Sequence, residues 1–378
     1  MWRVSTVVDE RRELVRAVLA GEGVTATSRR LGVSRETAYK WLGRAKREGE
    51  AGLVDRSRRP LRSPRKTAPE IEEAVCALRQ THPAWGGRKL HHYLRARGFE
   101  RLPSPTTITD ILRRKGLLPA DRRLKRDWQR FEAEQPNEMW QMDFKGDFPL
   151  ERGRCYTLTV LDDHSRFNLC LQACADQRSD TVRRQLLPVF ATYGLPETIL
   201  VDNGPPWGSA YSPQPHTRFT AWLMQLGIYV SHGRPYHPQT RGKDERFHRS
   251  LGHEVLAGRS WQDLTEVQQA LDSWRAVYNL ERPHEALAYG VPASRYAASQ
   301  RSLPQELPKP EYQDGDEVRR VQALGEIYFR GRIQRIGKAF SGQAVALRAT
   351  EEEGVWGAYY YRQQVGRVDL RSPLLGDL

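Results

Sequence analysis

The sequence predicts a multidomain protein with all-α N-terminal units, a central α/β region built on a mixed sheet, and a small C-terminal β domain. At 378 residues the chain is longer than a typical single domain. Apolar residues recur with helical spacing up to about residue 118, and short β-rich runs alternate with helices from about residue 137. After residue 311 the pattern is that of short β-runs alone.

Positive charge is concentrated in the first third of the chain. The whole chain has 60 Lys+Arg and 46 Asp+Glu, a net charge of +14. Residues 1–130 hold 31 basic and 15 acidic residues, whereas residues 131–378 hold 29 and 31. Such an excess favours a polyanionic partner. We therefore expect a nucleic-acid-binding arm ahead of a nearly neutral body.

The first predicted domain, residues 1–52, has the pattern of three short helices with a turn at Gly32. Ser34 is placed to cap the third helix, whose apolar positions follow the i, i+3, i+4, i+7 spacing of a buried stripe. We interpret this region as a helix-turn-helix DNA-binding domain that inserts the third helix into the major groove. A solvated amphipathic helix is the alternative interpretation. The predicted DNA contacts are Arg35, Lys40, Arg44 and Arg47.

Residues 53–66 are predicted to be a basic linker. Six positive charges and two prolines fall within the eleven residues 56–66, a composition that cannot bury a core. An extended basic chain can follow phosphates or enter a minor groove. Arg58, Arg59 and Arg62 are therefore predicted DNA contacts, and a simple spacer is the alternative.

A second trihelical pattern covers residues 67–118, and Ser104 is placed to cap its last helix. We interpret it as a second helix-turn-helix domain, with Arg113 and Arg114 as predicted DNA contacts. Two such units joined by a basic linker would read a bipartite site. The alternative is that the second unit is a packing or dimerisation module. Residues 119–134 are expected to form another linker.

Three carboxylates stand out by position in the central region. Asp143 lies in or at the end of the first predicted strand, Asp202 ends a short buried strand, and Glu245 lies in the first turn of a helix. Open α/β sheets place ligands at the carboxyl ends of strands, and a helix N-terminus favours an ionised carboxylate. Mg²⁺ and Mn²⁺ prefer such oxygen ligands, and two ions together support in-line displacement at phosphorus. The sequence has no Walker-type glycine loop or Ser/His/Asp elbow that competes.

The flanking residues of these acids form ordered motifs. They are Trp140-Gln-Met-Asp143, Leu161-Asp-Asp-His-Ser-Arg166, Val201-Asp-Asn-Gly204, Arg234-Pro-Tyr-His-Pro-Gln-Thr240 and Gly242-Lys-Asp-Glu-Arg-Phe-His248. Together they resemble the integrase-type catalytic core of bacterial insertion-sequence transposases, which belong with retroviral integrases to the DDE superfamily. The segment Tyr278-Asn-Leu-Glu-Arg-Pro-His284 resembles the region that follows such cores. The resemblance covers most of the chain.

The resemblance implies a ribonuclease-H-like DDE catalytic core over residues 135–258. It implies that the three carboxylates form the catalytic triad and hold two Mg²⁺ or Mn²⁺ ions per active site. It further implies that Lys243 approaches the DNA end, and Arg246 is a second candidate contact beside it.

The sequence departs from such cores in its spacing, because 42 residues separate Asp202 from Glu245, more than is usual; Trp207 after the Asp-Asn-Gly turn and Pro188 within a predicted helix are two further departures. Other acids lie close to the motifs. Asp162 and Asp163 neighbour charged residues, so a structural or salt-bridge role is favoured for them over metal binding. Asp244 is excluded because successive side chains on a helix point about 100° apart.

The C-terminal third has two predicted parts. Residues 259–303 are expected to be a helical extension packed against the core, and residues 311–378 a small antiparallel β-barrel, as the resemblance also implies. DNA contact through Arg330, Arg332 and Arg335 and a dimerisation surface are both open interpretations of this domain.

These patterns favour a transposase that binds the terminal inverted repeats of a mobile DNA element, cleaves its 3′ ends and joins them to target DNA. Double-stranded DNA and self-association as a dimer or higher assembly are the expected partners. A non-catalytic DNA-binding regulator derived from a transposase is the alternative, and a nuclease acting on hybrids would leave the helix-turn-helix units unexplained. The four cysteines lack CxxC spacing, and no 18-residue apolar run or signal peptide occurs. We expect a cytoplasmic, nucleoid-associated bacterial protein without membrane contact.

Overall fold

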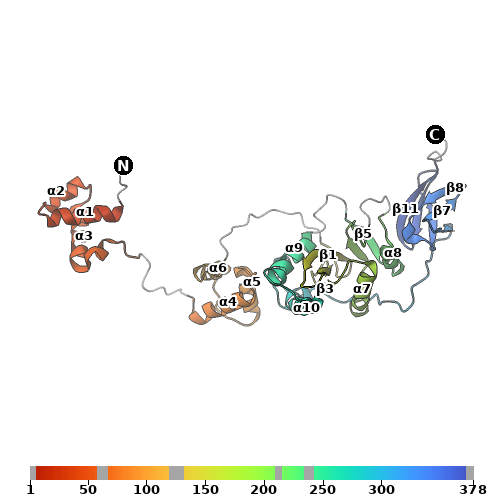
Figure 1. Ribbon diagram of the computed structural model, residues 1–378, viewed down its shortest axis with the longest axis horizontal. Coiled ribbons are helices and arrows are strands. Elements are labelled where there is room, and N and C mark those ends of the chain that lie inside the picture. Colours follow the sequence, from red (N-terminus) through yellow and green to blue (C-terminus); the bar gives the residue numbers. More distant parts are fainter. Residues whose placement is uncertain (1–5, 58–66, 119–131, 209–214, 234–241, 372–378) are drawn as a thin grey trace. The chain divides into compact units, whose positions relative to one another are not determined.

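The computed structural model describes residues 6–57, 67–118, 132–208, 215–233 and 242–371, and Figure 1 gives the order of the elements. The chain forms two compact units, Met1–Lys66 and Thr67–Leu378. Within these described ranges, no helix is both long enough and apolar enough to cross a membrane.

The first unit is a trihelical domain, as predicted. Its helices are α1 (Val7–Leu19), α2 (Val24–Arg30) and α3 (Arg35–Glu48), followed by a short 3₁₀ turn, η1 (Gly49–Leu53). The Ser34 side chain accepts a hydrogen bond from the Thr37 N–H and caps α3. The small core is formed by Leu14, Ala38, Trp41 and Leu53.

The second unit begins with the second trihelical domain, which also matches the prediction. It contains α4 (Pro69–Thr81), α5 (Gly87–Ala96) and α6 (Pro105–Arg114), and Ser104 caps α6. A β-carbon at Gly87 would lie 2.5 Å from the Pro105 carbonyl oxygen, so glycine is what allows α5 and α6 to pack this closely. The core contains Val75, Trp85, Leu90, Leu94, Ile108, Ile111 and Leu112.

A five-stranded mixed sheet forms the centre of the second unit, in the order β3-β2-β1-β4-β5. The first three strands are antiparallel neighbours, whereas β1, β4 and β5 run parallel. This is the predicted ribonuclease-H-like arrangement. The strands are β1 (Met139–Pro149), β2 (Arg154–Asp162), β3 (Asn168–Cys174), β4 (Thr198–Val201) and β5 (Tyr229–His232), and the helices are α7 (Ser179–Tyr193), α8 (Arg218–Gln225), α9 (Gly242–Leu251) and α10 (Leu264–Leu280).

Helices cover both faces of this sheet. One face packs against α7 and α8 in a single core that includes Trp140, Met142, Phe144, Leu186, Phe190 and Trp222. The other packs against α9 and α10 through Leu161, Leu171, Phe247, Leu251 and Trp274. Because side chains alternate along a strand, Gln141 and Asp143 in β1 point to the α9 side.

The C-terminal region forms antiparallel sheets, but the described strands do not close into the predicted barrel. A four-stranded sheet has the order β11-β10-β9-β6, and β7 and β8 form a separate pair. A closed barrel requires the two edge strands to pair, and here β6 and β11 remain at opposite edges of an open sheet. The strands are β6 (Glu317–Arg320), β7 (Glu326–Phe329), β8 (Arg332–Arg335), β9 (Ala344–Ala349), β10 (Val355–Tyr360) and β11 (Gln363–Asp369).

The C-terminal sheet is joined to the edge of the central sheet by the buried side chain of Gln363. Its Oε1 accepts from the Val230 N–H at 2.9 Å, and its Nε2 donates to the Val230 carbonyl at 2.8 Å. One amide thus satisfies both outward backbone groups of Val230 on the edge strand β5. Residues of both sheets also share one hydrophobic core.

Candidate active site

The strand register brings two of the predicted carboxylates to the same place. Gln141 of β1 lies opposite Leu200 of the parallel strand β4. Asp143 follows Gln141 by two residues, and Asp202 follows Leu200 by two residues. The two aspartates therefore lie on neighbouring parallel strands, at the end where β4 stops and a ligand can approach.

Backbone groups orient both aspartates. The Phe144 N–H donates to Asp143 Oδ1 at 2.8 Å, and the Gly204 N–H donates to Asp202 Oδ1 at 2.8 Å. A β-carbon on Gly204 would lie 3.3 Å from each carboxylate oxygen of Asp202. Glycine in this turn therefore lets the chain fold back closely against the aspartate. His232 of β5 supports the same turn, since its Nδ1 donates to the Asp202 carbonyl at 3.1 Å.

Glu245 is exposed in the first turn of α9, as predicted for its helix position. The opposite side of this helix is buried through Asp244, Phe247 and Leu251, and the last two pack in the core under α10. Asp244 therefore points away from Glu245, as the helical geometry predicts. Within the described residues, no three His, Cys, Asp or Glu side chains lie close enough together to hold a metal ion.

The donor set nevertheless suits a hard divalent cation. It consists of carboxylates from a strand, a strand end and a helix start, which are the oxygen ligands that Mg²⁺ and Mn²⁺ prefer. Helix α9 is attached to β1 and β2 on the face that carries Asp143: His248 Nε2 lies 2.9 Å from Thr159 Oγ1, and the Thr159 hydroxyl donates to the Asp143 carbonyl at 3.0 Å. Burial, with Lys145 nearby, lowers the pKa of His248 to about 4, so its imidazole is neutral at pH 7.

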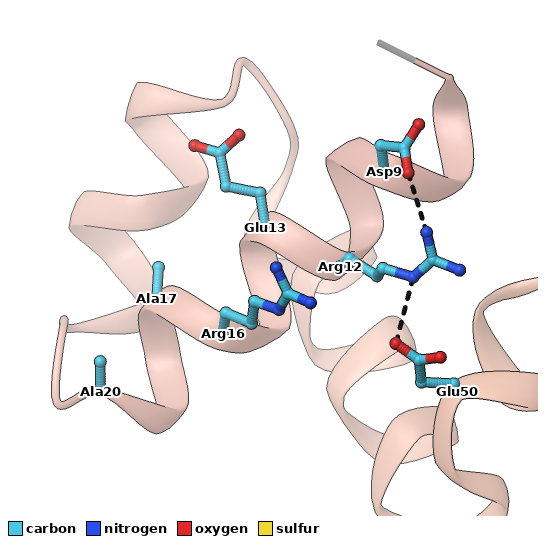
Figure 2. Close-up of a pocket in the computed structure, with 7 residues that line it drawn as sticks. All are labelled: Asp9, Arg12, Glu13, Arg16, Ala17, Ala20 and Glu50. Carbon is cyan, nitrogen blue, oxygen red and sulfur yellow. Dashed lines mark hydrogen bonds and ion pairs between the residues drawn. The ribbon is translucent and has the colours of Figure 1, made fainter.

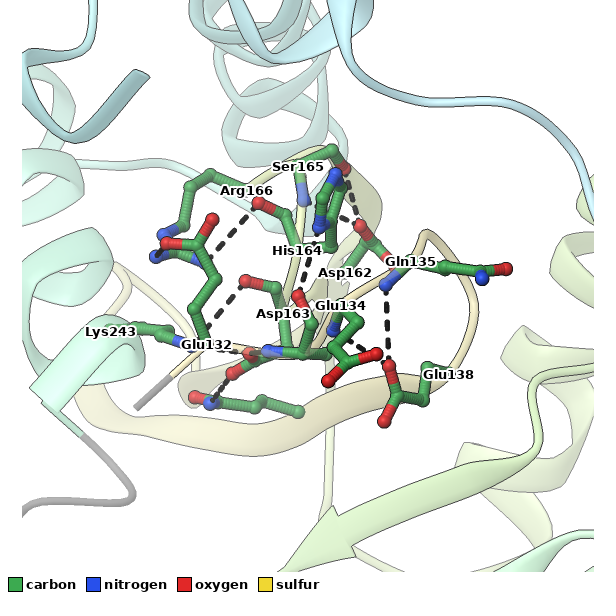
Figure 3. Close-up of polar contacts among 12 residues, drawn as sticks. Glu132, Glu134, Gln135, Glu138, Asp162, Asp163, His164, Ser165, Arg166 and Lys243 are labelled. Carbon is green, nitrogen blue, oxygen red and sulfur yellow. Dashed lines mark hydrogen bonds and ion pairs between the residues drawn. The ribbon is translucent and has the colours of Figure 1, made fainter. Parts of the chain in front are cut away.

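The turn after β2 has the structural role that the sequence favours for its acids (Figure 3). Asp162 is fully buried and accepts from the backbone N–H groups of Asn137 and Ser165, each at 2.7 Å. Burial raises the pKa of this carboxyl. Asp163, also buried, accepts from the Ala133 N–H and forms an ion pair with Lys243. Both acids are thus engaged inside the fold.

Five known families match successive parts of the chain. A helix-turn-helix domain matches residues 10–60 and a homeodomain-like domain residues 37–112. Two integrase core domain families match residues 133–238 and 226–292. The C-terminal domain of IS481 family transposases matches residues 316–373. The chain belongs to the insertion-sequence transposases with an integrase core.

The relatives of this transposase include proteins of other insertion elements. An uncharacterized 39.2 kDa protein of insertion element IS476 from Xanthomonas euvesicatoria is 26% identical over 75% of this chain and 81% of its own length. An uncharacterized 31.7 kDa protein of IS407 from Burkholderia multivorans is 28% identical over 62% of this chain and 84% of its own. Among solved structures, the HTLV-2 integrase catalytic core in complex with magnesium is 15% identical, with 44% of this chain and 100% of that chain aligned and a TM-score of 0.34.

One predicted DNA contact in the first unit of the transposase, Arg44, lies inside the fold. Arg44 is buried, with its guanidinium 4.7 Å from the Trp41 ring and donating to the Val54 carbonyl at 3.0 Å. Its side chain therefore stabilises the unit from within. The other three predicted contacts on α3, Arg35, Lys40 and Arg47, are exposed. Arg58, Arg59 and Arg62 of the predicted linker lie outside the described residues.

The predicted contacts on α6 and α9 all have acidic neighbours. Arg113 and Arg114 are exposed on α6 and form ion pairs with Asp110 and Glu72. Arg246 is exposed and lies 3.8 Å from Glu285. Lys243 is largely buried against Asp163. Their contact with DNA stays a prediction.

The second trihelical domain is docked on the segment that follows α10, a contact that the sequence analysis missed. The Tyr93 hydroxyl donates to Glu281 at 2.9 Å, and Arg97 forms an ion pair with the same carboxylate at 3.0 Å. Arg88 forms an ion pair with Glu285 at 3.1 Å. These contacts come from α5, so they support the alternative interpretation that this helix serves packing within the protein. The basic end of α6 is not used and stays exposed. Glu281 belongs to the segment 278–284, which the sequence analysis singled out without assigning it a partner. That segment was therefore the available sequence signal for this contact.

A pocket in the first unit is unrelated to these carboxylates (Figure 2). Charged side chains of its lining are paired with one another, since Arg12 bridges Asp9 at 2.8 Å and Glu50 at 3.2 Å. We therefore assign it a role in stabilising the unit. It is lined by Asp9, Arg12, Glu13, Arg16, Ala17, Ala20 and Glu50.

Proposed function

We propose that this transposase binds the terminal inverted repeats of its mobile element and catalyses metal-dependent 3′-end cleavage and strand transfer. The observation that supports the proposal is the register of β1 and β4: Asp143 lies within β1, Asp202 directly follows the neighbouring parallel strand β4, and Glu245 lies in the first turn of α9. These three carboxylates would hold two Mg²⁺ or Mn²⁺ ions. The chemistry that such a pair supplies is activation of the attacking oxygen and stabilisation of the departing one.

The reaction consists of two displacements at phosphorus. In the first, a water oxygen attacks the phosphorus at the element end and the bond from phosphorus to the 3′ oxygen breaks, which leaves a 3′-OH. In the second, this 3′-OH attacks a target phosphorus and the target's own 3′ oxygen departs. The protein's contribution is to orient the carboxylates: the N–H groups of Phe144 and Gly204 hold those of Asp143 and Asp202.

DNA recognition is assigned to the trihelical units. The exposed Arg35, Lys40 and Arg47 suit phosphate or base contacts from α3. The basic end of α6 would contact a second part of the repeat. Two element ends must be brought together before joining, so we expect a dimer or higher assembly on double-stranded DNA.

The test uses duplex oligonucleotides copied from the DNA that flanks the gene on each side. We expect the purified full-length protein to cleave and join them with Mg²⁺, and expect Asp143→Asn, Asp202→Asn and Glu245→Gln to abolish joining without loss of end binding. Asp180→Asn is the control, because Asp180 is also an exposed acid in the first turn of a helix. Undiminished joining by the three variants would refute the triad.

A DNA-binding regulator without catalysis is the second candidate. The observation in its favour is that the described side chains do not form a ready metal cluster. Gel shifts of the flanking DNA without any cleavage in Mg²⁺ or Mn²⁺ would support this alternative and contradict the first proposal.

A further inference from the structure

Helix α9 is attached to the central sheet by two polar bridges, one on each side of Glu245 along the chain. The first bridge is centred on Asp163 (Figure 3). Its Oδ1 accepts from Gln141 Nε2 at 2.6 Å, and its Oδ2 pairs with Lys243 Nζ. Gln141 precedes Asp143 by two residues on β1, and Lys243 precedes Glu245 by two residues on α9.

The second bridge joins His248 to the backbone of Asp143 through Thr159. The Thr159 hydroxyl donates its only hydrogen to the Asp143 carbonyl at 3.0 Å. His248 Nε2, at 2.9 Å from the same hydroxyl oxygen, must therefore be the donor. Thr159 is fully buried and pairs with Asp143 in the β1–β2 register. The bridge thus ends on the main chain of a predicted metal ligand.

The two bridges together restrict how Glu245 can move. Lys243 and His248 are five residues apart, which is about 7.5 Å along a helix axis. Two attachments at this separation oppose both rotation and sliding of the first turns of α9. The first bridge ends on Asp163 and Gln141, which are each 1% exposed. The second bridge ends on the backbone carbonyl of Asp143 in the sheet. Because these partners are buried, the two bridges can fix the position of α9 more firmly than an exposed ion pair on the surface could.

We propose that Asp163, Thr159 and His248 are positioning residues that hold Glu245 in register with Asp143 and thereby set the affinity of the carboxylate site for a divalent cation. This inference rests on the proposed function, because it assumes that the carboxylates bind metal. None of the three residues is a ligand in this proposal. Residues that orient metal ligands typically change metal affinity or activity about 10–100-fold when they are replaced.

The test measures Mn²⁺ binding to the full-length protein from the electron paramagnetic resonance signal of free Mn²⁺. Thr159→Val keeps the shape of the side chain and removes the hydroxyl. Asp163→Asn replaces one carboxylate oxygen with an N–H₂ group, which cannot accept from the neighbouring donors Ala133 N–H, Gln141 Nε2 and Lys243 Nζ. We expect each to raise the Mn²⁺ dissociation constant about 10–100-fold. Thr159→Ser and His248→Gln keep a hydroxyl and an N–H donor respectively, and should bind Mn²⁺ nearly as the parent protein does.

Thr157→Val is the matched control. Thr157 is as buried as Thr159 on the same face of β2, and its hydroxyl belongs to neither bridge. Thermal unfolding of every variant separates loss of fold from loss of position, since a merely structural role would lower the melting temperature without changing Mn²⁺ affinity in the folded protein. Mg²⁺-dependent cleavage gives a second measure: the Mg²⁺ concentration at half-maximal rate should rise in Thr159→Val and not in Thr157→Val.

Two failures are distinguishable. If the parent protein binds Mn²⁺, and Asp143→Asn and Glu245→Gln weaken it, but Thr159→Val and Asp163→Asn bind like Thr157→Val, the positioning role is refuted and the proposed function stands. If the parent protein binds no Mn²⁺, or the triad variants bind it equally well, both proposals are overturned.

Discussion

Replacing Gln363 with methionine keeps the volume of a buried side chain and removes both of its hydrogen bonds to Val230. The Gln363 side chain is only 6% exposed, so water cannot easily take its place. The Val230 N–H and carbonyl would each lose a partner at 2.9 and 2.8 Å. A buried polar group left unsatisfied costs about 1–3 kcal/mol. With two such groups, we expect the contact between β5 and the C-terminal sheet to weaken by about 2–6 kcal/mol.

Hydrogen exchange measures this loss at the position where it occurs. Since about 1.4 kcal/mol corresponds to a factor of ten, the Val230 amide should exchange about 30-fold faster or more in Gln363→Met. Gln364→Met is the control, because Gln364 is the exposed neighbour on the same strand. If the Val230 amide stayed as protected in Gln363→Met as in Gln364→Met, the reasoning about the edge contact would be refuted.

Three further changes test other parts of the structure. Gly204→Ala should weaken Mn²⁺ binding without lowering the melting temperature, because its β-carbon would press on the Asp202 carboxylate at 3.3 Å; unchanged affinity would contradict this. His248 has a pKa lowered from about 6.5 to about 4, so its contribution to stability is complete above pH 6.5 and is lost as the pH falls towards 4, by at most about 3 kcal/mol. The difference between the unfolding free energies measured in urea at pH 7 and at pH 4.5 should therefore be smaller for His248→Gln than for the parent protein. Glu281→Ala should lower the unfolding free energy by about 1 kcal/mol and Glu281→Gln by less, because glutamine still accepts from Tyr93; equal effects would argue against that hydrogen bond.

Much of the fold could be predicted because its signals are local. Ser34 and Ser104 precede helices as caps, and the apolar spacing in α3 and α6 marks their buried faces. The strands of the central sheet were recognisable from short apolar runs that end in turns. The antiparallel C-terminal sheet was also predictable, but its closure into a barrel is not confirmed by the described strands, because closure depends on two edge strands meeting and no local sequence pattern indicates this.

The three carboxylates stay predicted ligands, whereas the contacts that surround them could not be predicted from the sequence. The motifs identify Asp143 and Asp202, whereas the pairing of Asp163 with Lys243 joins residues 80 positions apart. The burial of Arg44 had a signal in the sequence: it lies three residues after Trp41, next to the buried stripe of the helix. An arginine there can lay its stem over the ring and face inward.

The hydrogen bonds between Gln363 and the edge strand β5 also bear on where the integrase-like region ends. In the sequence, the integrase-like region is complete by about residue 303, and a fragment ending there would retain every predicted ligand. In the fold, the N–H and carbonyl of Val230 on the edge strand are both satisfied by a side chain 133 residues further along the sequence. Without that side chain the fragment would present an open strand edge on which a second chain can add a strand. The border suggested by the sequence families therefore leaves out a side chain that pairs with the edge of the central sheet.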